Sequence, residues 1–249
     1  MKKIETLLKN YEIKEHVIKI AVPAMEEYMN SILEWNKKVN LTAITNREEF
    51  IDKHLADSLM CAGSKEIRNA KTIIDVGTGA GFPGIPLALV FPEKSFLLLD
   101  SQNKKIGIVK EAAEKAEIRN AIFIHGRAED LAREKDYREK FDLCLSRAVA
   151  PMAVLLEYCL PFVRKGGDFL AYKGAKWLQE MDAAENALDI LGGKKTRIDK
   201  ERGNRACSYI YSQRKGNTRK ISPKGWKAFQ ISPFIKMFHV KHFFIVAYF

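Results

Sequence analysis

The sequence has few cysteines and no long apolar run. Its four cysteines, Cys61, Cys144, Cys159 and Cys207, are widely separated and show neither metal-site nor disulfide spacing. No apolar run approaches the ~20 residues that a membrane-spanning helix needs. Residues 1–16 interleave charged with apolar positions and lack the apolar core of a signal peptide. We therefore expect a cytoplasmic protein with reduced, mostly buried thiols, no membrane association and no bound metal.

Acidic residues are almost missing from the C-terminal end of the chain. Residues 200–249 contain eleven Lys or Arg and one acid, Glu201, so they carry +10 of the net charge of +11. A basic segment on a near-neutral body is typical of a protein that contacts a polyanion such as RNA. A solvated basic tail without a partner is the alternative interpretation.

The chain shows no internal repeat. The spacing of its apolar and charged residues changes twice along the sequence. We expect an N-terminal helical region over 1–66, an α/β domain over 67–212 and a basic tail over 213–249. Apolar residues recur at helical spacing in the first region, where Pro23 predicts a kink or a break and a second short helix is expected over 47–60.

Short apolar runs alternate with helical patterns in the α/β domain. The expected strands are 72–76, 95–100, 121–125, 141–145, 168–173 and 208–212, and helices are expected over 102–116, 152–161 and 176–190. Near-continuous apolar strands that alternate with helices are typical of a parallel sheet covered on both faces. The sequence therefore predicts an α/β fold of this kind.

A glycine loop, DVGTGAGFPG, directly follows the first expected strand and allows two interpretations. Gly79, Gly81 and Gly84 match the dinucleotide fingerprint, whereas Asp75 with Gly77, Gly79 and Gly81 matches the pattern D-x-G-x-G-x-G. A phosphate loop of the Walker type is excluded because no G-K-[ST] follows. Ligands of doubly wound sheets bind outside the carboxyl ends of the strands, so we expect the ligand at this loop.

Acidic residues at three successive strand ends discriminate between the ligands. The Asp75 carboxylate would repel a pyrophosphate at short range, but it would attract the ammonium and sulfonium groups of S-adenosylmethionine. Asp100 ends the second strand, where a carboxylate binds ribose hydroxyls, and Glu129 follows the third strand, near the expected adenine edge. Each residue alone has a helix-capping role as its alternative. Together the three predict S-adenosylmethionine as the ligand.

Segments along most of the chain resemble a known family. They are WNKKVNLTAIT (35–45), KHLADSL (53–59), DVGTGAGFPGIPLA (75–88), LLDS (98–101), GRAED (126–130), FDLCLSRAVAP (141–151) and GGDFLAYKG (166–174). The similar family is ribosomal RNA small subunit methyltransferase G, also called glucose-inhibited division protein B. The resemblance covers roughly residues 1–212. It implies a Rossmann-like class I methyltransferase fold, S-adenosylmethionine as cofactor, and methylation of one guanine of 16S rRNA at the 7-position nitrogen.

The resemblance and the strand-end argument together name eight cofactor-binding residues. They are Gly77, Phe82, Ala128, Glu129 and Arg147 from the resemblance, Gly79 from the glycine loop, and Asp75 and Asp100 from the strand ends. The 7-position nitrogen of guanine carries no proton, so we expect no catalytic general base and expect alignment to dominate the rate. The sequence also lacks an Asn-Pro-Pro-Tyr-type motif and a Pro-Cys nucleophile, and Cys144 is expected in the core.

The remaining polar residues have plainer interpretations. Lys173 is expected either to contact RNA phosphate or to be a solvated lysine at the end of a strand. His54 and Asp57 have no further potential metal ligands at suitable spacing in the sequence, so we expect them to form hydrogen bonds. Packing and capping of the helical region are expected of Trp35, Asn36, Asn40 and Thr42.

The expected partner is 16S rRNA in the 30S subunit or its precursor, bound by a monomer, and four alternatives stay open. An NAD-dependent dehydrogenase is disfavoured by Asp75 and by the lack of a convincing catalytic histidine. A methyltransferase that acts on a small molecule would leave the basic tail without a purpose; another RNA is a further possible substrate. A non-catalytic RNA-binding protein would tolerate Gly79→Asp. The tail 213–249 lacks the Gly-Thr-Pro segment typical of the family, which puts its family role in doubt.

Overall fold

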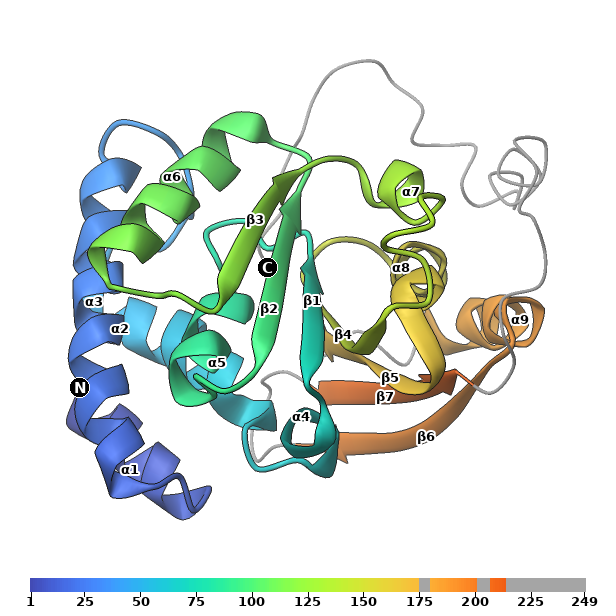
Figure 1. The fold of residues 1–249 in the computed structure, drawn as a ribbon, viewed down its shortest axis with the longest axis horizontal. Helices are drawn as coiled ribbons and strands as arrows, with labels where there is room; N and C mark the ends of the chain where they lie inside the picture. The colour runs from blue at the N-terminus through green and yellow to red at the C-terminus, as the bar shows by residue number, and fades with distance from the viewer. Residues whose placement is uncertain (175–179, 201–206, 214–249) are drawn as a thin grey trace. The chain divides into compact units, whose positions relative to one another are not determined.

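The computed structural model describes residues 1–174, 180–200 and 207–213 (Figure 1). They belong to one unit of dense internal contacts, Met1–Gly216. Apart from Gln213, the predicted basic tail lies outside the described residues, and so does the first part of the helix expected over 176–190.

The N-terminal region is helical, as the sequence predicts. Its elements are α1 (Lys2–Asn10), α2 (Glu15–Asn36), α3 (Arg47–Phe50), the π-helical turn η1 (Ile51–Ala56), the short 3-10 turn η2 (Leu59–Cys61) and α4 (Lys65–Asn69). Asn46 begins the second helical segment, because its side chain accepts hydrogen bonds from the amides of Glu48 and Glu49. The break considered at Pro23 is wrong: α2 continues through it, since the helix buries Val22 and Met25 on either side.

The described residues form a seven-stranded sheet in the order β3-β2-β1-β4-β5-β7-β6 (Figure 1). Its strands are β1 (Thr72–Val76), β2 (Ser95–Asp100), β3 (Ala121–His125), β4 (Phe141–Arg147), β5 (Val163–Lys173), β6 (Gly193–Lys200) and β7 (Cys207–Gln213). Strands β1 to β5 pair in parallel. The expectation of a wholly parallel sheet is wrong at its far end, because β7 runs antiparallel to both β5 and β6.

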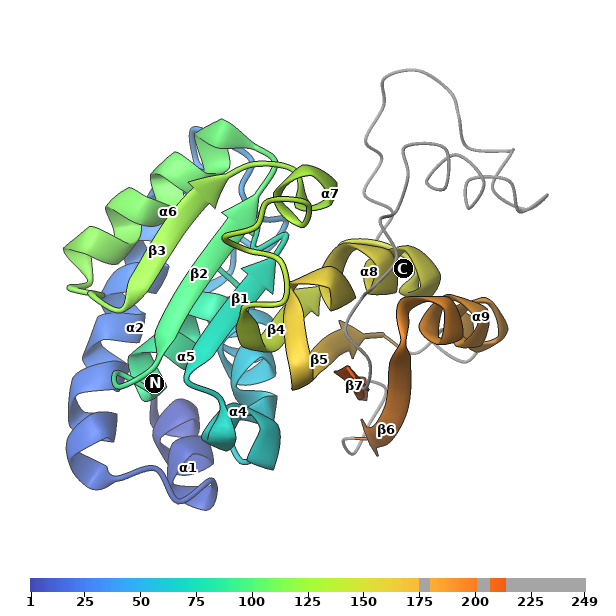
Figure 2. The ribbon, with the colours of Figure 1, turned by 45° about the vertical axis from the view of Figure 1, so that its right-hand side comes forward.

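Helices cover both faces of the sheet (Figure 2). They are α5 (Gly84–Val90), α6 (Asn103–Lys115), α7 (Ala128–Leu131), α8 (Met152–Cys159), the 3-10 turn η3 (Leu160–Phe162) and α9 (Met181–Leu191). Helix α2 packs against α5 and α6 on one face, whereas α8 packs against α9 and α7 on the other. The N-terminal region therefore extends one of the two helical layers.

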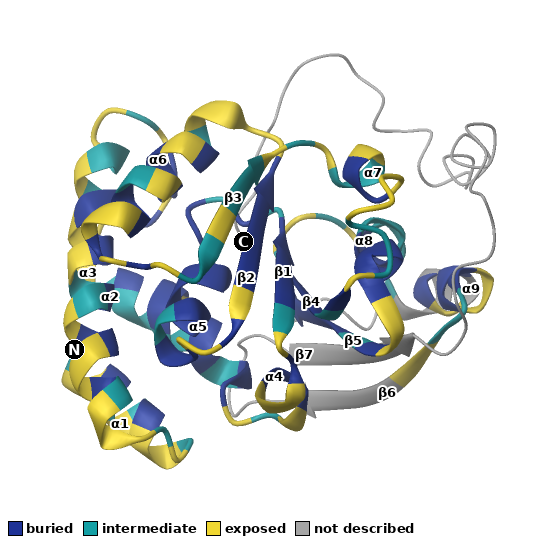
Figure 3. Ribbon diagram, in the orientation of Figure 1, coloured by how far each residue is buried: buried dark blue, intermediate teal, exposed yellow. Residues whose placement is uncertain are grey.

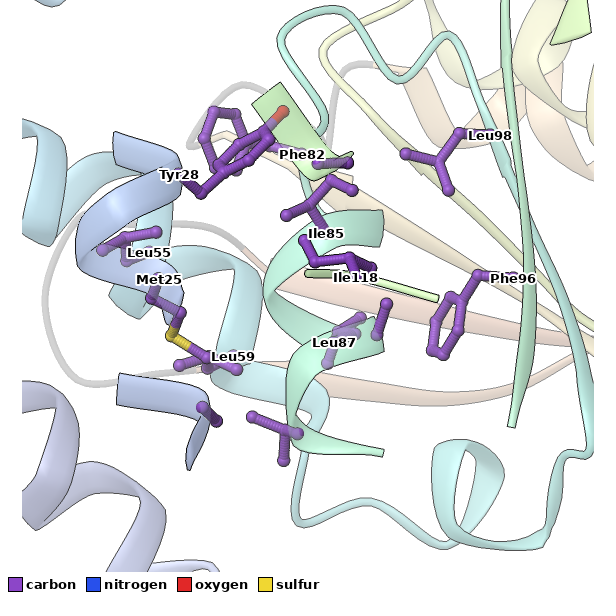
Figure 4. Packing of buried hydrophobic residues seen from close by; sticks show 14 of the residues in the cluster. Met25, Tyr28, Leu55, Leu59, Phe82, Ile85, Leu87, Phe96, Leu98 and Ile118 are labelled. Carbon is purple, nitrogen blue, oxygen red and sulfur yellow. The ribbon is translucent and has the colours of Figure 1, made fainter. Parts of the chain in front are cut away.

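The buried core runs from the N-terminal helices into the sheet. Met25, Tyr28 and Leu55 of the N-terminal region meet Phe82 and Ile85 in one hydrophobic cluster (Figure 4). Strands β1 and β2 are almost entirely buried at the centre, whereas β3 at the edge is partly exposed (Figure 3). This cluster joins the helical region to the segment that follows β1.

Two further expectations concern the cysteines and the membrane. Cys61, Cys144 and Cys159 are free thiols and buried, as predicted. Within the described part of the chain, no helix combines the length and the apolarity that crossing a membrane requires.

Candidate cofactor site

The loop after β1 is held in a conformation that requires glycine. The amides of Gly77 and Thr78 donate hydrogen bonds to the Leu99 carbonyl of β2, at 2.8 and 3.1 Å. Gly77 has φ of 72° and Gly81 has φ of 88°, in the left-handed region that residues with a side chain rarely adopt. A Cβ at Gly77 would also overlap the side chain of Val149. Gly77 and Gly81 are therefore needed because the backbone of this loop has positive φ angles at both positions.

Gly79 is the open point of this loop. Its φ is 60°, and apart from its chain neighbours no described residue has an atom within 4 Å of the position that a Cβ would take. Its amide donates a 2.8 Å hydrogen bond to Oδ2 of Asp100, which joins the loop to the end of β2. The backbone is therefore accessible at the carboxyl end of the sheet, which is what a closely approaching ligand needs.

Asp75 lies inside the loop. Its side chain is fully buried, and Oδ2 accepts hydrogen bonds from Thr78 Oγ1 at 2.7 Å and from the Gly84 amide at 2.8 Å. Oδ1 has no hydrogen-bond partner among the described residues. Burial raises the pKa of the carboxyl from 3.8 to about 6. The structure thus shows a loop-shaping role for Asp75, and its attraction of a ligand cation stays a prediction.

Asp100 ends β2 with its carboxylate beside the loop. Oδ2 accepts from the Gly79 amide and Oδ1 from the Gln102 amide, both at 2.8 Å. An ionised carboxylate has about four acceptor positions, so each oxygen retains capacity for a further donor. The side chain is buried and fixed, which suits it to accept hydroxyl groups in a defined geometry.

Ala128 and Glu129 begin α7, just after β3. Glu129 Oε1 accepts a 2.6 Å hydrogen bond from Arg127 Nε and is ion-paired with the same guanidinium. Arg127 therefore offsets the charge of Glu129. The predicted attraction of a cationic ligand by three acids is weaker than the sequence suggests, because one of the three is neutralised.

The Phe82 side chain packs among aromatic rings of the N-terminal region. It is buried and stacks on His54, with ring centroids 4.5 Å apart and an interplanar angle of 3°. Its ring also meets the edges of Phe50 and Tyr28, as Figure 4 shows for Tyr28. The ring is therefore engaged by the N-terminal region, and the Phe82 amide donates to the Thr78 carbonyl at 2.9 Å.

Arg147, at the end of β4, is bound to the N-terminal region. Its Nη1 donates to Asp57 Oδ2 at 2.8 Å and to the Lys53 carbonyl at 3.0 Å, and its Nη2 donates to His54 Nδ1 at 3.0 Å. The guanidinium carbon lies 5.4 Å from the centre of the Phe82 ring. The hydrogen bonding predicted for His54 and Asp57 is confirmed.

Lys173, at the end of β5, is neither solvated nor unpaired. Its side chain is 12% exposed, donates to the Ala150 carbonyl at 3.1 Å and pairs with Glu180 Oε2 at 2.6 Å. The same Glu180 oxygen accepts from the Met152 amide at 2.7 Å. The solvated alternative is wrong, and the predicted phosphate contact is not supported because Glu180 already neutralises the ammonium. Lys173 instead holds the segment after β4 in place, through the Ala150 carbonyl and through Glu180.

Asn36 and Thr42, for which packing and capping were predicted, form hydrogen bonds in the turn after α2. Asn36 Oδ1 accepts from the amides of Leu41 and Thr42, at 2.8 and 3.0 Å. Thr42 Oγ1 accepts from the Ile44 amide and lies 2.7 Å from His54 Nε2. The turn after α2 is therefore linked by hydrogen bonds to η1.

Three residues near the loop were not predicted. The Tyr28 hydroxyl donates to the Ala80 carbonyl at 2.9 Å, and Val149 packs on Gly77. Tyr28 lies 52 residues from Ala80, so no local signal could have found it. Thr78 follows Asp75 by three residues, a spacing at which a hydroxyl bonds locally, so this signal was present.

The described residues fit a nucleoside ligand without phosphates. Gly79 exposes backbone, Asp100 retains acceptor capacity, and Asp75 Oδ1 is a buried acceptor without a partner. The acceptor capacity left on Asp75 and Asp100 suits hydroxyl and ammonium groups, and their carboxylates disfavour phosphates. These features fit S-adenosylmethionine better than a dinucleotide. No group of three potential metal ligands occurs in the described residues.

Comparisons with known proteins identify the family of this chain. Residues 21–208 match the GidB family, described as rRNA small subunit methyltransferase G. The chain is 51% identical over 169 residues to a ribosomal RNA small subunit methyltransferase G of Lachnoclostridium phytofermentans, covering 68% of this chain and 70% of that protein. It is 46% identical over 183 residues to the same-named protein of Alkaliphilus metalliredigens, covering 74% and 77%.

A solved structure supports the fold independently. The crystal structure of an O-methyltransferase from Bacillus cereus in complex with SAH superimposes with a TM-score of 0.53 at 17% identity, over 74% of this chain and 89% of that one. At this identity the likeness concerns the fold alone. The predicted Rossmann-like α/β fold is confirmed, and the chain, an S-adenosylmethionine-dependent methyltransferase, belongs to the rRNA small subunit methyltransferase G family.

Proposed function

We propose that this methyltransferase methylates the 7-position nitrogen of one guanine in 16S rRNA, using S-adenosylmethionine. The relatives' name supports small-subunit ribosomal RNA as the substrate class. The observation that carries the donor assignment is the open backbone at Gly79, which lies between the carboxyl ends of β1 and β2 and bonds to Asp100.

Each of the eight predicted residues has a proposed role at this site. The backbone of Gly77, Gly79 and Phe82 lets the cofactor approach. Asp100 accepts the ribose hydroxyls, and Ala128 with Glu129 lies against the adenine. Asp75 shapes the loop, and Arg147 retains donors at the end of β4.

No proton transfer by the protein is needed in this reaction. S-adenosylmethionine, when bound, supplies an electrophilic methyl group. The guanine nitrogen offers a lone pair and carries no proton, so the protein has only to orient the two reactants. His54 is engaged at both ring nitrogens and Asp75 is buried, so neither is placed to take a proton from a substrate. We therefore assign no catalytic general base.

The proposed setting is the cytoplasm, with a monomer acting on the 30S subunit or its precursor. The free, buried thiols Cys61, Cys144 and Cys159 support a reducing compartment. The basic residues of 200–249 support a contact with RNA phosphates.

The test is to incubate the purified protein with methyl-labelled S-adenosylmethionine and 30S subunits that lack the modification. The RNA is then digested and the labelled nucleoside identified. We expect label in 7-methylguanosine of 16S rRNA. Label in another nucleoside, or only in a small molecule, would contradict the proposed substrate.

Two glycine variants distinguish the effect of a carboxylate placed in the loop from the effect of a carboxylate added elsewhere on the protein. Gly79→Asp places a charge on the open loop beside Asp100 and should abolish methylation. Gly107→Asp makes the same change on the exposed side of α6 and should retain methylation. Apart from the backbone of its own helix, no described residue has an atom within 4 Å of the position that a Cβ of residue 107 would take. Equal activity in both variants would contradict the placement of the cofactor.

A further inference from the structure

The segment KHLADSL (53–59) has no role in the proposed reaction so far, yet it contacts the end of β4. We propose that Asp57 and His54 are positioning residues of the cofactor site, because they hold the Arg147 guanidinium so that two of its N–H groups stay available to a ligand. This inference rests on the proposed function, in which Arg147 completes the cofactor pocket.

The donors of Arg147 can be accounted for one by one. A guanidinium has five N–H groups. Nη1 uses both of its hydrogens, on Asp57 and on the Lys53 carbonyl, and Nη2 uses one, on His54. The hydrogen of Nε and the second hydrogen of Nη2 have no partner among the described residues. Adjacent N–H groups of one guanidinium form the fork that binds a carboxylate or phosphate.

Asp57 supplies the countercharge that keeps Arg147 in this position. The two side chains are 20% and 14% exposed and meet at 2.8 Å. In such partial burial a guanidinium that loses its carboxylate is left with an uncompensated charge and moves towards solvent. Asp57 therefore determines where the free N–H groups of Arg147 lie.

The π-helical turn η1 brings three acceptors to one guanidinium. The Asp57 amide bonds to the carbonyls of Asp52 and His54, five and three residues earlier, so it does not occupy the Lys53 carbonyl. The Lys53 carbonyl, His54 Nδ1 and Asp57 Oδ2 all accept from Arg147. The π-helical turn thus places three acceptors where the guanidinium of Arg147 can donate to all of them.

His54 is a fixed, neutral acceptor. Arg147 can only donate, so Nδ1 of His54 must accept, and the ring proton is on Nε2, 2.7 Å from Thr42 Oγ1. Burial, and next the charge of Arg147, lower the pKa of His54 to about 3. The ring also lies flat on Phe82. His54 therefore contacts both the segment after β1, through Phe82, and the end of β4, through Arg147.

The test measures cofactor affinity, which does not depend on the RNA. The full-length chain and its Asp57→Ala, Arg147→Ala and double variants are titrated with S-adenosylmethionine in a calorimeter. We expect Asp57→Ala to weaken binding about tenfold, as coupled neighbours do. In the Arg147→Ala background the same change should have no further effect, because the group that Asp57 positions is gone.

Three further variants distinguish positioning from folding. Asp57→Asn keeps an oxygen acceptor for Nη1 but removes the countercharge, so its affinity should lie between those of the wild type and Asp57→Ala. His54→Phe keeps a ring on Phe82 but removes the acceptor of Nη2, so it should weaken binding. Asp52→Ala removes an acid of the same turn, paired with Lys3, and should bind as the wild type does.

The outcomes separate this inference from the proposed function. Unchanged affinity in Asp57→Ala and His54→Phe, with Arg147→Ala weakened, would overturn the positioning role. Losses that add in the double variant would also overturn it, since they would indicate a general structural effect. Wild-type protein that binds no S-adenosylmethionine would overturn the proposed function, and the inference with it.

Discussion

At the scale of single residues, Asp75 combines a structural role with an unusual proton affinity. Its carboxyl anchors Thr78 and Gly84 while one oxygen stays without a partner among the described residues. Because burial raises its pKa from 3.8 to about 6, the folded state binds this proton more tightly than the unfolded state. The resulting stabilisation is complete below about pH 4 and is lost as the pH rises through 6.

The variant Asp75→Asn tests this account. Its amide oxygen can still accept from Thr78 and Gly84, but it has no charge to bury. We expect its free energy of unfolding to rise relative to the wild type between pH 4 and pH 7, by at most about 3 kcal/mol. Urea unfolding at several pH values measures this difference. A difference that does not change with pH would contradict the raised pKa.

At the scale of elements, α2 supports the glycine loop through one hydrogen bond. The Tyr28 hydroxyl donates to the Ala80 carbonyl, and a Cβ on Gly81 would overlap that hydroxyl. Burial raises the pKa of Tyr28, so the phenol stays protonated and remains a donor. The N-terminal region thereby determines the shape of the loop next to its open point.

We expect Tyr28→Phe to lower the free energy of unfolding by about 1 kcal/mol, because the buried carbonyl loses its donor. Affinity for S-adenosylmethionine should fall as well, since Ala80 adjoins Gly79. Thermal unfolding and calorimetric titration measure the two effects. Tyr137→Phe is the control, because no hydrogen bond of its hydroxyl is found in the described residues. Affinity unchanged in Tyr28→Phe would contradict the support of the loop by α2.

The elements also show where sequence patterns fail. Strand β6, GKKTRIDK, lacks an apolar run, so only its pairing with β7 identifies it as a strand. The predicted helix over 47–60 contains the π-helical turn η1, because tertiary contacts decide between helix types that share one apolar pattern. Pro23 lies inside α2 for the same reason: packing on both sides outweighs a lost hydrogen bond.

At the scale of the whole molecule, the basic charge is concentrated at the end of the sequence. A variant that ends at Gln213 keeps β7 whole and removes eight Lys or Arg. We expect its affinity for 16S rRNA to depend less steeply on salt, with the slope reduced by roughly 0.7 to 0.9 for each phosphate that the shortened protein no longer neutralises. Filter binding at several salt concentrations measures the slope.

A shorter deletion serves as the control. Removing residues 234–249 takes away only two lysines, Lys236 and Lys241, so it should change the slope much less. An unchanged slope in the longer deletion would place the RNA contact within residues 1–213. Cofactor affinity should be the same in both deletions, because the predicted site residues all precede residue 148.

The sequence by itself determined the fold class, the family and the position of the glycine loop. Apolar runs, glycine spacing and strand-end acids are local patterns, and parallel strands bring their carboxyl ends to one edge. Only the tertiary structure decided which side of the loop is open, at Gly79, and which groups hold Arg147. Arg147 and Asp57 are 90 residues apart, and Tyr28 and Ala80 are 52 apart. Hydrogen bonds over such separations depend on how layers pack, and no pattern along the chain encodes that distance.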